Sequence, residues 1–227
     1  MMNSDAKYLL LDTSGLALRL ALADSKQLTQ EIHVYQENIH SRMLAPLVQQ
    51  ILSTHDLQVG DLAAIGVNIG PGSFTGLRIG MAVIKGMVFG LDLPIVGIPG
   101  SDILAQAYFA SGPDQKKATV LLDARRNEFF VTHFEFKNGI ARSEQSAVVM
   151  TMATLTEKIP PDAVILTHHL TAKQYEMLDR VDSLRRIEVP FRFTAMQQML
   201  NARLASGSWP GYENLEPLYV RAFAGVL

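Results

Sequence analysis

The sequence contains no cysteine and carries no marked excess of charge of either sign, because its 20 lysines and arginines and its 22 acids give a formal net charge of −2. The missing cysteines exclude disulfides, thiolate metal sites and cysteine nucleophiles. The balanced charge leaves no basic footprint of the kind that strong autonomous nucleic-acid binding needs. The N-terminal residues also lack a basic segment that leads into a long apolar stretch, so no signal peptide is predicted. These absences together favour a cytoplasmic protein.

No apolar run is long enough to suggest a membrane span. The most apolar segment, residues 77–98, is interrupted by Arg78, Lys85, Asp92 and Pro94, whereas a span needs ~20 predominantly apolar residues. We therefore predict a buried helix and strand there, and no membrane partner. With 227 residues, 48% of them hydrophobic and 19% charged, the chain has room for one large domain or two small ones.

Two segments of the chain repeat the same pattern of strand, acid and turn. Asp12 and Asp123, 111 positions apart, each follow an apolar strand and precede a second strand-like segment. The repeat suggests two lobes of related topology, although two unrelated hairpins with a turn-forming Asp remain the alternative. Strands that alternate with helices predict a mixed α/β protein.

Residues 1–105 would form the N-terminal lobe, and residues 106–227 a smaller, divergent lobe whose C-terminal segment can pack back on the first. In the second half, helices are expected over 101–110, 151–158, 171–180 and 194–206, and strands over 163–166 and 184–189.

A glycine-rich turn lies between a predicted strand and a predicted helix. The apolar run 62–69 indicates a buried strand, and a helical pattern runs from Phe74 to about Leu91. The free N–H groups and the macrodipole at such a helix N-terminus suit a phosphate or another anion. No lysine follows Gly76, which excludes a Walker loop, and the glycine spacing does not fit the dinucleotide fingerprint. In the alternative interpretation, the glycines serve only a tight turn and close helix packing. The candidate nucleotide site, in vestigial form, comprises Asp12, Gly70, Gly72, Ser73, Thr75 and Gly76.

Two predicted helices share a large amount of apolar surface. The segment 40–54 has apolar residues on one face of a 3.6-residue period, whereas the segment 74–91 is apolar nearly all round. A helix that is apolar on all sides must be covered on all sides, either by the 40–54 helix alone or by another subunit as well. If a partner supplies the cover, replacing Met43 or Leu47 by Asp should abolish its binding and leave the monomer folded. The predicted interface comprises Met43, Leu44, Leu47, Val48, Ile51, Arg78, Met81, Lys85 and Val88.

Residues suited to catalysis are few. The six histidines show none of the spacings typical of zinc sites. Asp12 and Asp123 are candidates to hold a magnesium-bound phosphate between the lobes, but both equally fit turn positions, and for Asp123 a turn position is the better interpretation. Ser73 has no His or Lys base nearby in the sequence. The adjacent Arg125 and Arg126 fit a solvated charge pair better than an anion clamp.

Five short motifs extend over most of the first half of the chain and into its middle. They are Asp12-Thr-Ser, residues 40–46 (HSRMLAP), residues 70–80 (GPGSFTGLRIG), residues 89–94 (FGLDLP) and residues 121–125 (LLDAR). With the stretch 217–221 (PLYVR), they resemble the bacterial TsaB (YeaZ) family, and the 70–80 motif is highly specific. The resemblance implies a two-lobed fold of the actin-like, sugar-kinase and heat-shock-chaperone (ASKHA) type, with duplicated mixed sheets flanked by helices.

The resemblance also implies a function. TsaB-like chains support the synthesis of threonylcarbamoyladenosine beside the anticodon of tRNAs that read codons beginning with A. They bind a related TsaD-type catalytic subunit, which transfers the threonylcarbamoyl group, and a TsaE-type ATPase joins them. The expected partners are these two subunits, a second copy of the chain in a homodimer when it is free, and tRNA only through the complex. No cofactor is expected on this chain alone, and ATP or ADP only within the complex.

The chain departs from its catalytic relatives where those carry a metal-binding H-x-x-x-H pair. The matching positions are Gly100 and Leu104, and neither side chain can bind a metal. The resemblance thus implies a non-catalytic subunit with no metal site and no catalytic residue. Two other function classes remain as alternatives. One is an ASKHA-type ATPase or phosphotransferase that uses Asp12 and the 70–76 turn, and the other is a glycoprotease-type peptidase that needs a metal or an activated Ser73.

Overall fold

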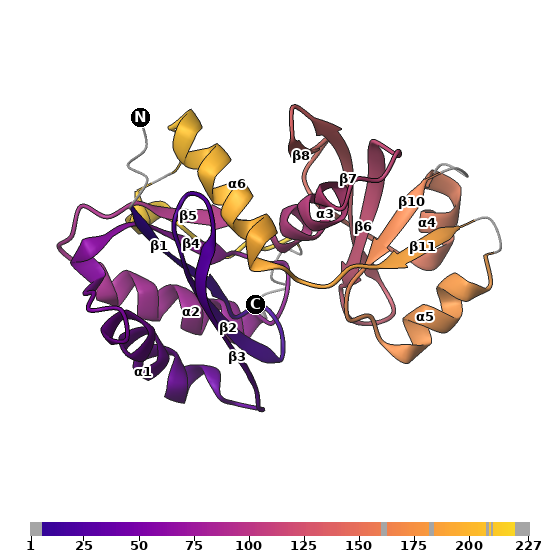
Figure 1. Ribbon diagram of the computed structural model, residues 1–227. Coiled ribbons are helices and arrows are strands. Elements are labelled where there is room, and N and C mark those ends of the chain that lie inside the picture. The colour runs from indigo at the N-terminus through magenta and orange to yellow at the C-terminus, as the bar shows by residue number, and fades with distance from the viewer. Residues whose placement is uncertain (1–5, 160–162, 182–183, 208, 210, 221–227) are drawn as a thin grey trace. The chain divides into compact units, whose positions relative to one another are not determined.

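The computed structural model describes residues 6–159, 163–181, 184–207, 209 and 211–220. Its contacts divide the chain into two compact units, each built on one β-sheet (Figure 1). The first unit reaches to Gly100 and also takes in Phe193–Pro217, and the second begins at Ser101 and reaches Arg192. Within the described residues, no helix is both long and apolar enough to cross a membrane.

The sheet of the first unit has the strand order β3-β2-β1-β4-β5. Strands β1 and β2 and strands β2 and β3 pair antiparallel, whereas β4 lies parallel to both β1 and β5. The connection from β3 to β4 is a crossover through a helix, as a change from antiparallel hairpins to parallel pairing requires. The strand bounds are β1 (Lys7–Asp12), β2 (Ala17–Ala23), β3 (Leu28–Tyr35), β4 (Leu62–Asn68) and β5 (Ile95–Ile98).

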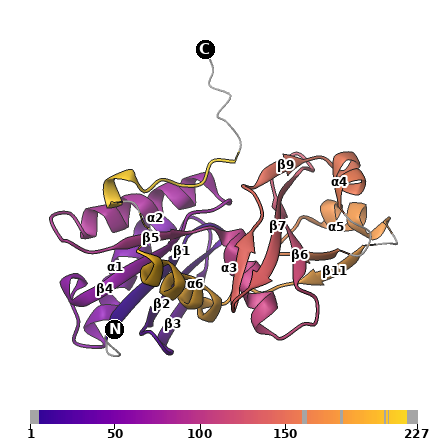
Figure 2. The same cartoon turned by 90° about the horizontal axis from the view of Figure 1, so that it is seen from above.

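Helices cover both faces of this sheet (Figures 1 and 2). Helices α1 (His40–Ser53) and α2 (Phe74–Met87) lie on one face, and α6 (Phe193–Ser206) packs against β1, β4 and β5 on the other. Alternation along the strands explains the two layers, because successive side chains of a strand point to opposite faces. Two short 3-10 helices, η1 (Val59–Asp61) and η2 (Tyr212–Asn214), complete the unit.

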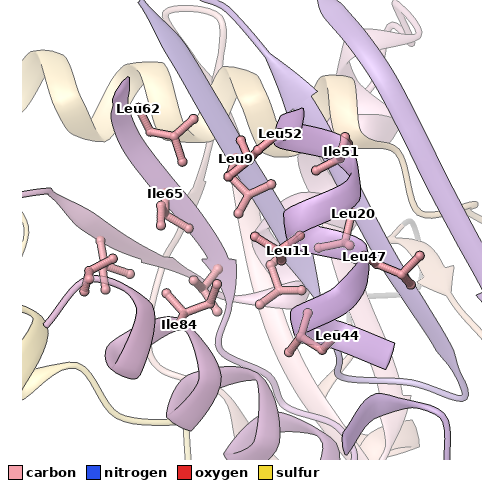
Figure 3. Packing of buried hydrophobic residues seen from close by; sticks show 14 of the residues in the cluster. Leu9, Leu11, Leu20, Leu44, Leu47, Ile51, Leu52, Leu62, Ile65 and Ile84 are labelled. Carbon is pink, nitrogen blue, oxygen red and sulfur yellow. The ribbon is translucent and has the colours of Figure 1, made fainter. Parts of the chain in front are cut away.

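The core between the sheet and helices α1 and α2 is made almost entirely of leucine, isoleucine and valine (Figure 3). Leu9 and Leu11 of β1 face Leu44 and Ile51 of α1, and all four side chains are fully buried. Burial of one such side chain contributes about 1.5–3 kcal/mol. The apolar period of residues 40–54 therefore marks the face of α1 that packs on the sheet.

The sheet of the second unit repeats the order of the first. Read from β8, its order is β8-β7-β6-β10-β11, with antiparallel pairs on the β8 side of β6 and parallel pairs on the β11 side. The duplication predicted from the two strand-Asp segments is thus present, and the chain has the ASKHA fold. The strand bounds are β6 (Lys117–Asp123), β7 (Phe129–Lys137), β8 (Ile140–Ser143), β9 (Val148–Met150), β10 (Val164–Thr167) and β11 (Arg185–Glu188). Its helices are α3 (Gly100–Ala110), α4 (Met152–Lys158) and α5 (Ala172–Asp179).

The structure corrects the end of one predicted helix, and the described residues stop short of the end of one sequence motif. Helix α2 ends at Met87 and not near Leu91, because the chain leaves the helix at Val88 and Gly90 takes a positive φ of 80°. Positive φ is the conformation in which glycine commonly ends a helix. The last residue of the 217–221 motif, Arg221, lies outside the described residues.

Candidate functional site

The glycine-rich turn packs against the loop between β1 and β2. The Ser73 N–H donates to the Ser14 carbonyl at 2.7 Å, and the Ser73 hydroxyl caps α2 by accepting from the Gly76 N–H at 3.2 Å. A Cβ on Gly72 would collide with the Ser14 carbonyl oxygen, and one on Gly76 with the Thr13 carbonyl oxygen. The glycines therefore allow two backbone carbonyls to approach the N-terminus of α2, at the place where the sequence suggested an anion.

Asp12 lies in a polar row that crosses the sheet on the α6 side. Arg19 is its partner on the neighbouring strand β2, and Asn68 ends strand β4 on the other side. The carboxylate of Asp12 accepts from Arg19 Nη1 at 2.7 Å, from Asn68 Nδ2 at 2.9 Å, and from the N–H and the hydroxyl of Ser14 at 2.9 and 2.6 Å. Asp12 is fully buried, and Arg19 and Asn68 are 6% and 3% exposed.

All of these contacts come from the same chain. Oδ1 of Asp12 accepts from the Ser14 N–H, the Ser14 hydroxyl and Asn68, and Oδ2 accepts from Arg19. The guanidinium of Arg19 also supplies the positive charge that a bound magnesium ion would bring. Asp12 is therefore part of an internal ion pair with Arg19.

The structure brings together most of the residues predicted as a nucleotide site. Asp12, Gly72, Ser73 and Gly76 meet through the β1–β2 loop. The N–H of Gly70 donates to Asn68 Oδ1 at 2.9 Å, and Gly70 adopts a φ of 103° that favours glycine. The side chain of Thr75 is exposed on the first turn of α2. Sequence reasoning missed Arg19, Ser14 and Asn68, which complete the network.

The resemblance pairs Gly100 and Leu104 with the metal ligands that it implies for catalytic relatives. Gly100 opens α3, close to the side chain of Asn68, and Leu104 is 2% exposed within the second unit. Across the residues that the structure describes, no group of three or more His, Cys, Asp or Glu side chains is placed to hold a metal ion.

The predicted partner interface needs correction. Six of its residues belong to the core under α1 and α2, with exposed fractions of at most 6%, and cannot offer surface to a partner. The error arose because an apolar period marks the side of a helix that is buried, and the sheet of the same chain already buries it. Of the other three, Met43 is 36% exposed, Arg78 stacks on the Phe74 ring at 3.9 Å, and Lys85 donates to the Glu213 carbonyl at 3.1 Å. The six core residues are Leu44, Leu47, Val48, Ile51, Met81 and Val88.

The outer side of α2 carries two exposed small residues, two half-buried apolar residues that also pack against the core, and the polar Thr75 and Arg78. We call it the outer stripe of α2; Ala82 and Gly86 are exposed, and Ile79 and Val83 are half-buried. The spacing by three and four residues places them on one line along the helix. The loop that follows adds Phe89, whose side chain is 80% exposed. The outer stripe comprises Thr75, Arg78, Ile79, Ala82, Val83 and Gly86.

Comparison with known proteins decides which family this arrangement belongs to. A family model described as TsaD, tRNA N6-adenosine threonylcarbamoyltransferase, matches residues 34–189. A protein of Bacillus subtilis named tRNA threonylcarbamoyladenosine biosynthesis protein TsaB is 30% identical over 178 residues, which cover 76% of this chain and 75% of that protein. The chain belongs to the TsaB family.

Other TsaB-family proteins agree with this assignment. The TsaB protein of Escherichia coli is 29% identical over 155 residues, which cover 67% of this chain and 66% of that protein. The solved structure of YeaZ from Pseudomonas aeruginosa has the same fold, with a TM-score of 0.77 and 23% identity over 94% of this chain and 99% of that one. The sequence motifs therefore identified the family correctly.

Proposed function

We propose that this TsaB-family chain is an accessory, non-catalytic subunit of the machinery that makes threonylcarbamoyladenosine in tRNA. The observation that carries the proposal is the similarity over three quarters of its length to a protein named for that biosynthesis. The TsaD-type subunit, whose family model also matches the chain, would carry out the transfer, with a TsaE-type ATPase as a further partner.

The non-catalytic role is supported by the state of the site. Gly100 and Leu104 stand where a catalytic relative would bind its metal, and Asp12 is neutralised by Arg19 inside the sheet. The Ser73 hydroxyl caps its own helix, so it is occupied by a structural contact. The nearby groups thus stabilise the turn between β4 and α2, and none is left in a catalytic arrangement with a base.

The outer stripe of α2, together with the exposed side of α1 that includes Met43, is the surface proposed for the TsaD-type subunit. Small residues such as Ala82 and Gly86 let another helix approach closely, and the exposed Phe89 adds apolar area at the end of the helix. An exposed apolar patch on a folded chain commonly marks an interaction site. The free chain would cover the same stripe by pairing with a second copy in a two-fold homodimer.

The interface is tested with Ala82→Glu. We expect it to weaken binding of the TsaD-type subunit at least 30-fold, because an interfacial charge left without a partner costs roughly 2 kcal/mol or more. The matched control is Ala205→Glu, which makes the same change at an exposed position of α6 on the other face of the sheet. Co-purification and calorimetry measure the binding, and rescue of cells depleted of their TsaB protein measures the function.

Either of two results would contradict the proposal. One is wild-type binding by Ala82→Glu at an unchanged melting temperature, which would place the interface elsewhere. The other is a failure of the wild-type chain both to bind a TsaD-type subunit and to restore threonylcarbamoyladenosine. Leu47→Asp is unsuitable for this test, since Leu47 is 6% exposed in the core and a charge there should unfold the unit.

We also propose that the chain alone holds no nucleotide with high affinity, and that ATP or ADP enters only with its partners. The Asp12 carboxylate accepts four internal hydrogen bonds, and the Ser73 N–H donates to the Ser14 carbonyl. A helix N-terminus by itself attracts an exposed anion by only about 0.3–1 kcal/mol. Titration calorimetry of the isolated chain with magnesium-ATP should therefore give no saturable heat at micromolar concentrations. Micromolar affinity that is lost on Ser73→Ala, or ATP turnover, would support an ATPase instead.

A further inference from the structure

The turn between β6 and β7 carries two adjacent arginines on a fixed backbone. Arg125, Arg126 and Asn127 all adopt positive φ angles of 64°, 54° and 59° and are all exposed. Three successive non-glycine residues in the left-handed region are rare, because each places its Cβ close to a carbonyl oxygen. Strain of this kind persists where surrounding contacts enforce it, and it gathers at functional sites.

The enforcing contacts come from the second unit itself. The N–H of Arg125 donates to Asp123 Oδ1 at 2.7 Å, and the Glu128 N–H closes the turn on the Arg125 carbonyl at 3.0 Å. Beneath the turn, the fully buried Gln174 of α5 donates at 2.9 Å both to Asp123 Oδ1 and to the Glu128 carbonyl. Its own Oε1 is held by the Thr171 N–H at 2.9 Å. The backbone that presents both arginines is therefore anchored to a helix of the same unit.

The position of the turn in the fold is one where ligands bind. Strands β6, β10 and β11 are parallel neighbours, so their carboxyl ends meet at one edge of the sheet. In open α/β sheets, ligands bind outside the carboxyl ends of the parallel strands. The turn lies at that edge, directly after β6.

The charges available at this edge favour an anion. Among the described residues, neither Arg125 nor Arg126 forms an ion pair or a side-chain hydrogen bond. Two acids at this edge bind within the chain. Asp123 Oδ1 accepts from the Arg125 N–H and from Gln174. Glu188 accepts from Thr167 and Tyr175 at 2.6 Å each. The two guanidinium groups are thus left to a partner from outside.

We propose that Arg125 and Arg126 form a contact site for the phosphodiester backbone of RNA. Guanidinium groups bind phosphate oxygens through charge-assisted, often bidentate hydrogen bonds, and contacts to the backbone position a nucleic acid without reading its bases. Both arginines are exposed on the turn, which suits a strand lying across the surface better than an enclosed mononucleotide. The assignment to RNA rests on the proposed role in tRNA modification, and the site belongs to the second unit, whereas the outer stripe of α2 belongs to the first.

The test uses the complex of the full chain with a TsaD-type subunit and an unmodified tRNA transcript that reads codons beginning with A. Arg125→Asn with Arg126→Asn removes both charges, and asparagine tolerates positive φ, so the turn is kept. Two lost phosphate contacts should lower tRNA affinity roughly 20- to 60-fold at about 0.1 M salt. They should also reduce the slope of log K against log salt by about 1.4–1.8. Arg125→Lys with Arg126→Lys keeps the charge and should stay within about threefold of wild type.

The control is Arg142→Asn with Arg180→Asn, which removes two exposed charges elsewhere on the same unit. Unchanged tRNA affinity in the Arg125 and Arg126 variant, or an equal loss in the control, overturns the proposal. Binding of inorganic phosphate or ATP that is lost in the variant, with tRNA affinity intact, assigns the site to a small phosphate ligand instead. If every variant still binds the TsaD-type subunit, a change in tRNA affinity does not come from a failure of the proposed function.

Discussion

Replacement of Arg19 by methionine should destabilise the first unit by about 3–5 kcal/mol. The variant leaves the Asp12 carboxylate buried without its cation, and removal of one partner from a buried ion pair has a cost of this size. Asp12 is fully buried and Arg19 is 6% exposed, so water cannot replace the lost guanidinium without opening the sheet. Methionine keeps the length and the apolar stem of the side chain, which limits the cavity left behind. Urea unfolding followed by far-UV circular dichroism measures the change.

A second variant separates the charge from the packing. Asp12→Asn combined with Arg19→Met leaves no buried charge, while the amide oxygen can still accept from Ser14 and Asn68. The double variant should therefore be more stable than Arg19→Met alone by about 1 kcal/mol or more, as expected for residues in direct contact. Arg142→Met, at an exposed position, should change the stability by no more than about 0.5 kcal/mol. A loss below about 1 kcal/mol in Arg19→Met would show that the ion pair has no structural role.

Most of the fold was predictable because its elements have strong local patterns. The leucines of β1 and the 3.6-residue period of α1 defined a strand and a helix that the structure reproduces, the helix as His40–Ser53. Strands β8 and β9 were missed. They have four and three residues, and only Ala141 and Met150 within them are buried. Such short edge strands are formed by pairing with β7, so their own sequence carries little signal.

The polar network of the candidate site was predictable only in part. Asp12 and the glycines stand out in the sequence because of their position after strands. Arg19 is the one charged residue of the strand sequence ALRLALA, and only the hairpin register places it opposite Asp12. A prediction would have needed that register, since a shift of one residue would turn Arg19 to the other face. Asn68 is brought to Asp12 by the parallel pairing of β4 with β1, a contact between residues 56 positions apart.

The partner surface could not be derived from hydrophobicity alone. The apolar residues of α1 and α2 that attracted notice, such as Leu44 and Val48, are fully or nearly fully buried by the sheet of their own unit. The exposed residues of α2 are Thr75, Arg78, Ala82 and Gly86, and none of them raises a hydrophobic signal. A surface for close helix packing is therefore recognised only when the structure shows which side of the helix is already covered.

Gly76→Ala should destabilise the first unit by about 3 kcal/mol, at the upper end of the range for overpacking. The added Cβ would collide with the Thr13 carbonyl oxygen, and this obstacle is backbone that cannot rotate away. Either α2 or the loop between β1 and β2 must move, which would also disturb the hydrogen bond from Ser73 to Ser14. Thermal and urea unfolding of the isolated chain measure the loss.

Gly86→Ala is the matched control on the same helix. Apart from the two adjacent residues and the nearby backbone of α2 itself, no atom lies within 4 Å of the position that its Cβ would take, so the variant should gain about 0.5–1 kcal/mol from the higher helix propensity of alanine. The opposite signs distinguish close packing at the glycine-rich turn from a general requirement for flexible glycines in α2. Equal effects at the two positions would contradict the packing role of Gly76. Affinity for the TsaD-type partner should not follow stability in this variant. The extra methyl group of Gly86→Ala lies on the outer stripe of α2, so the variant should bind the partner more weakly although the chain itself is more stable.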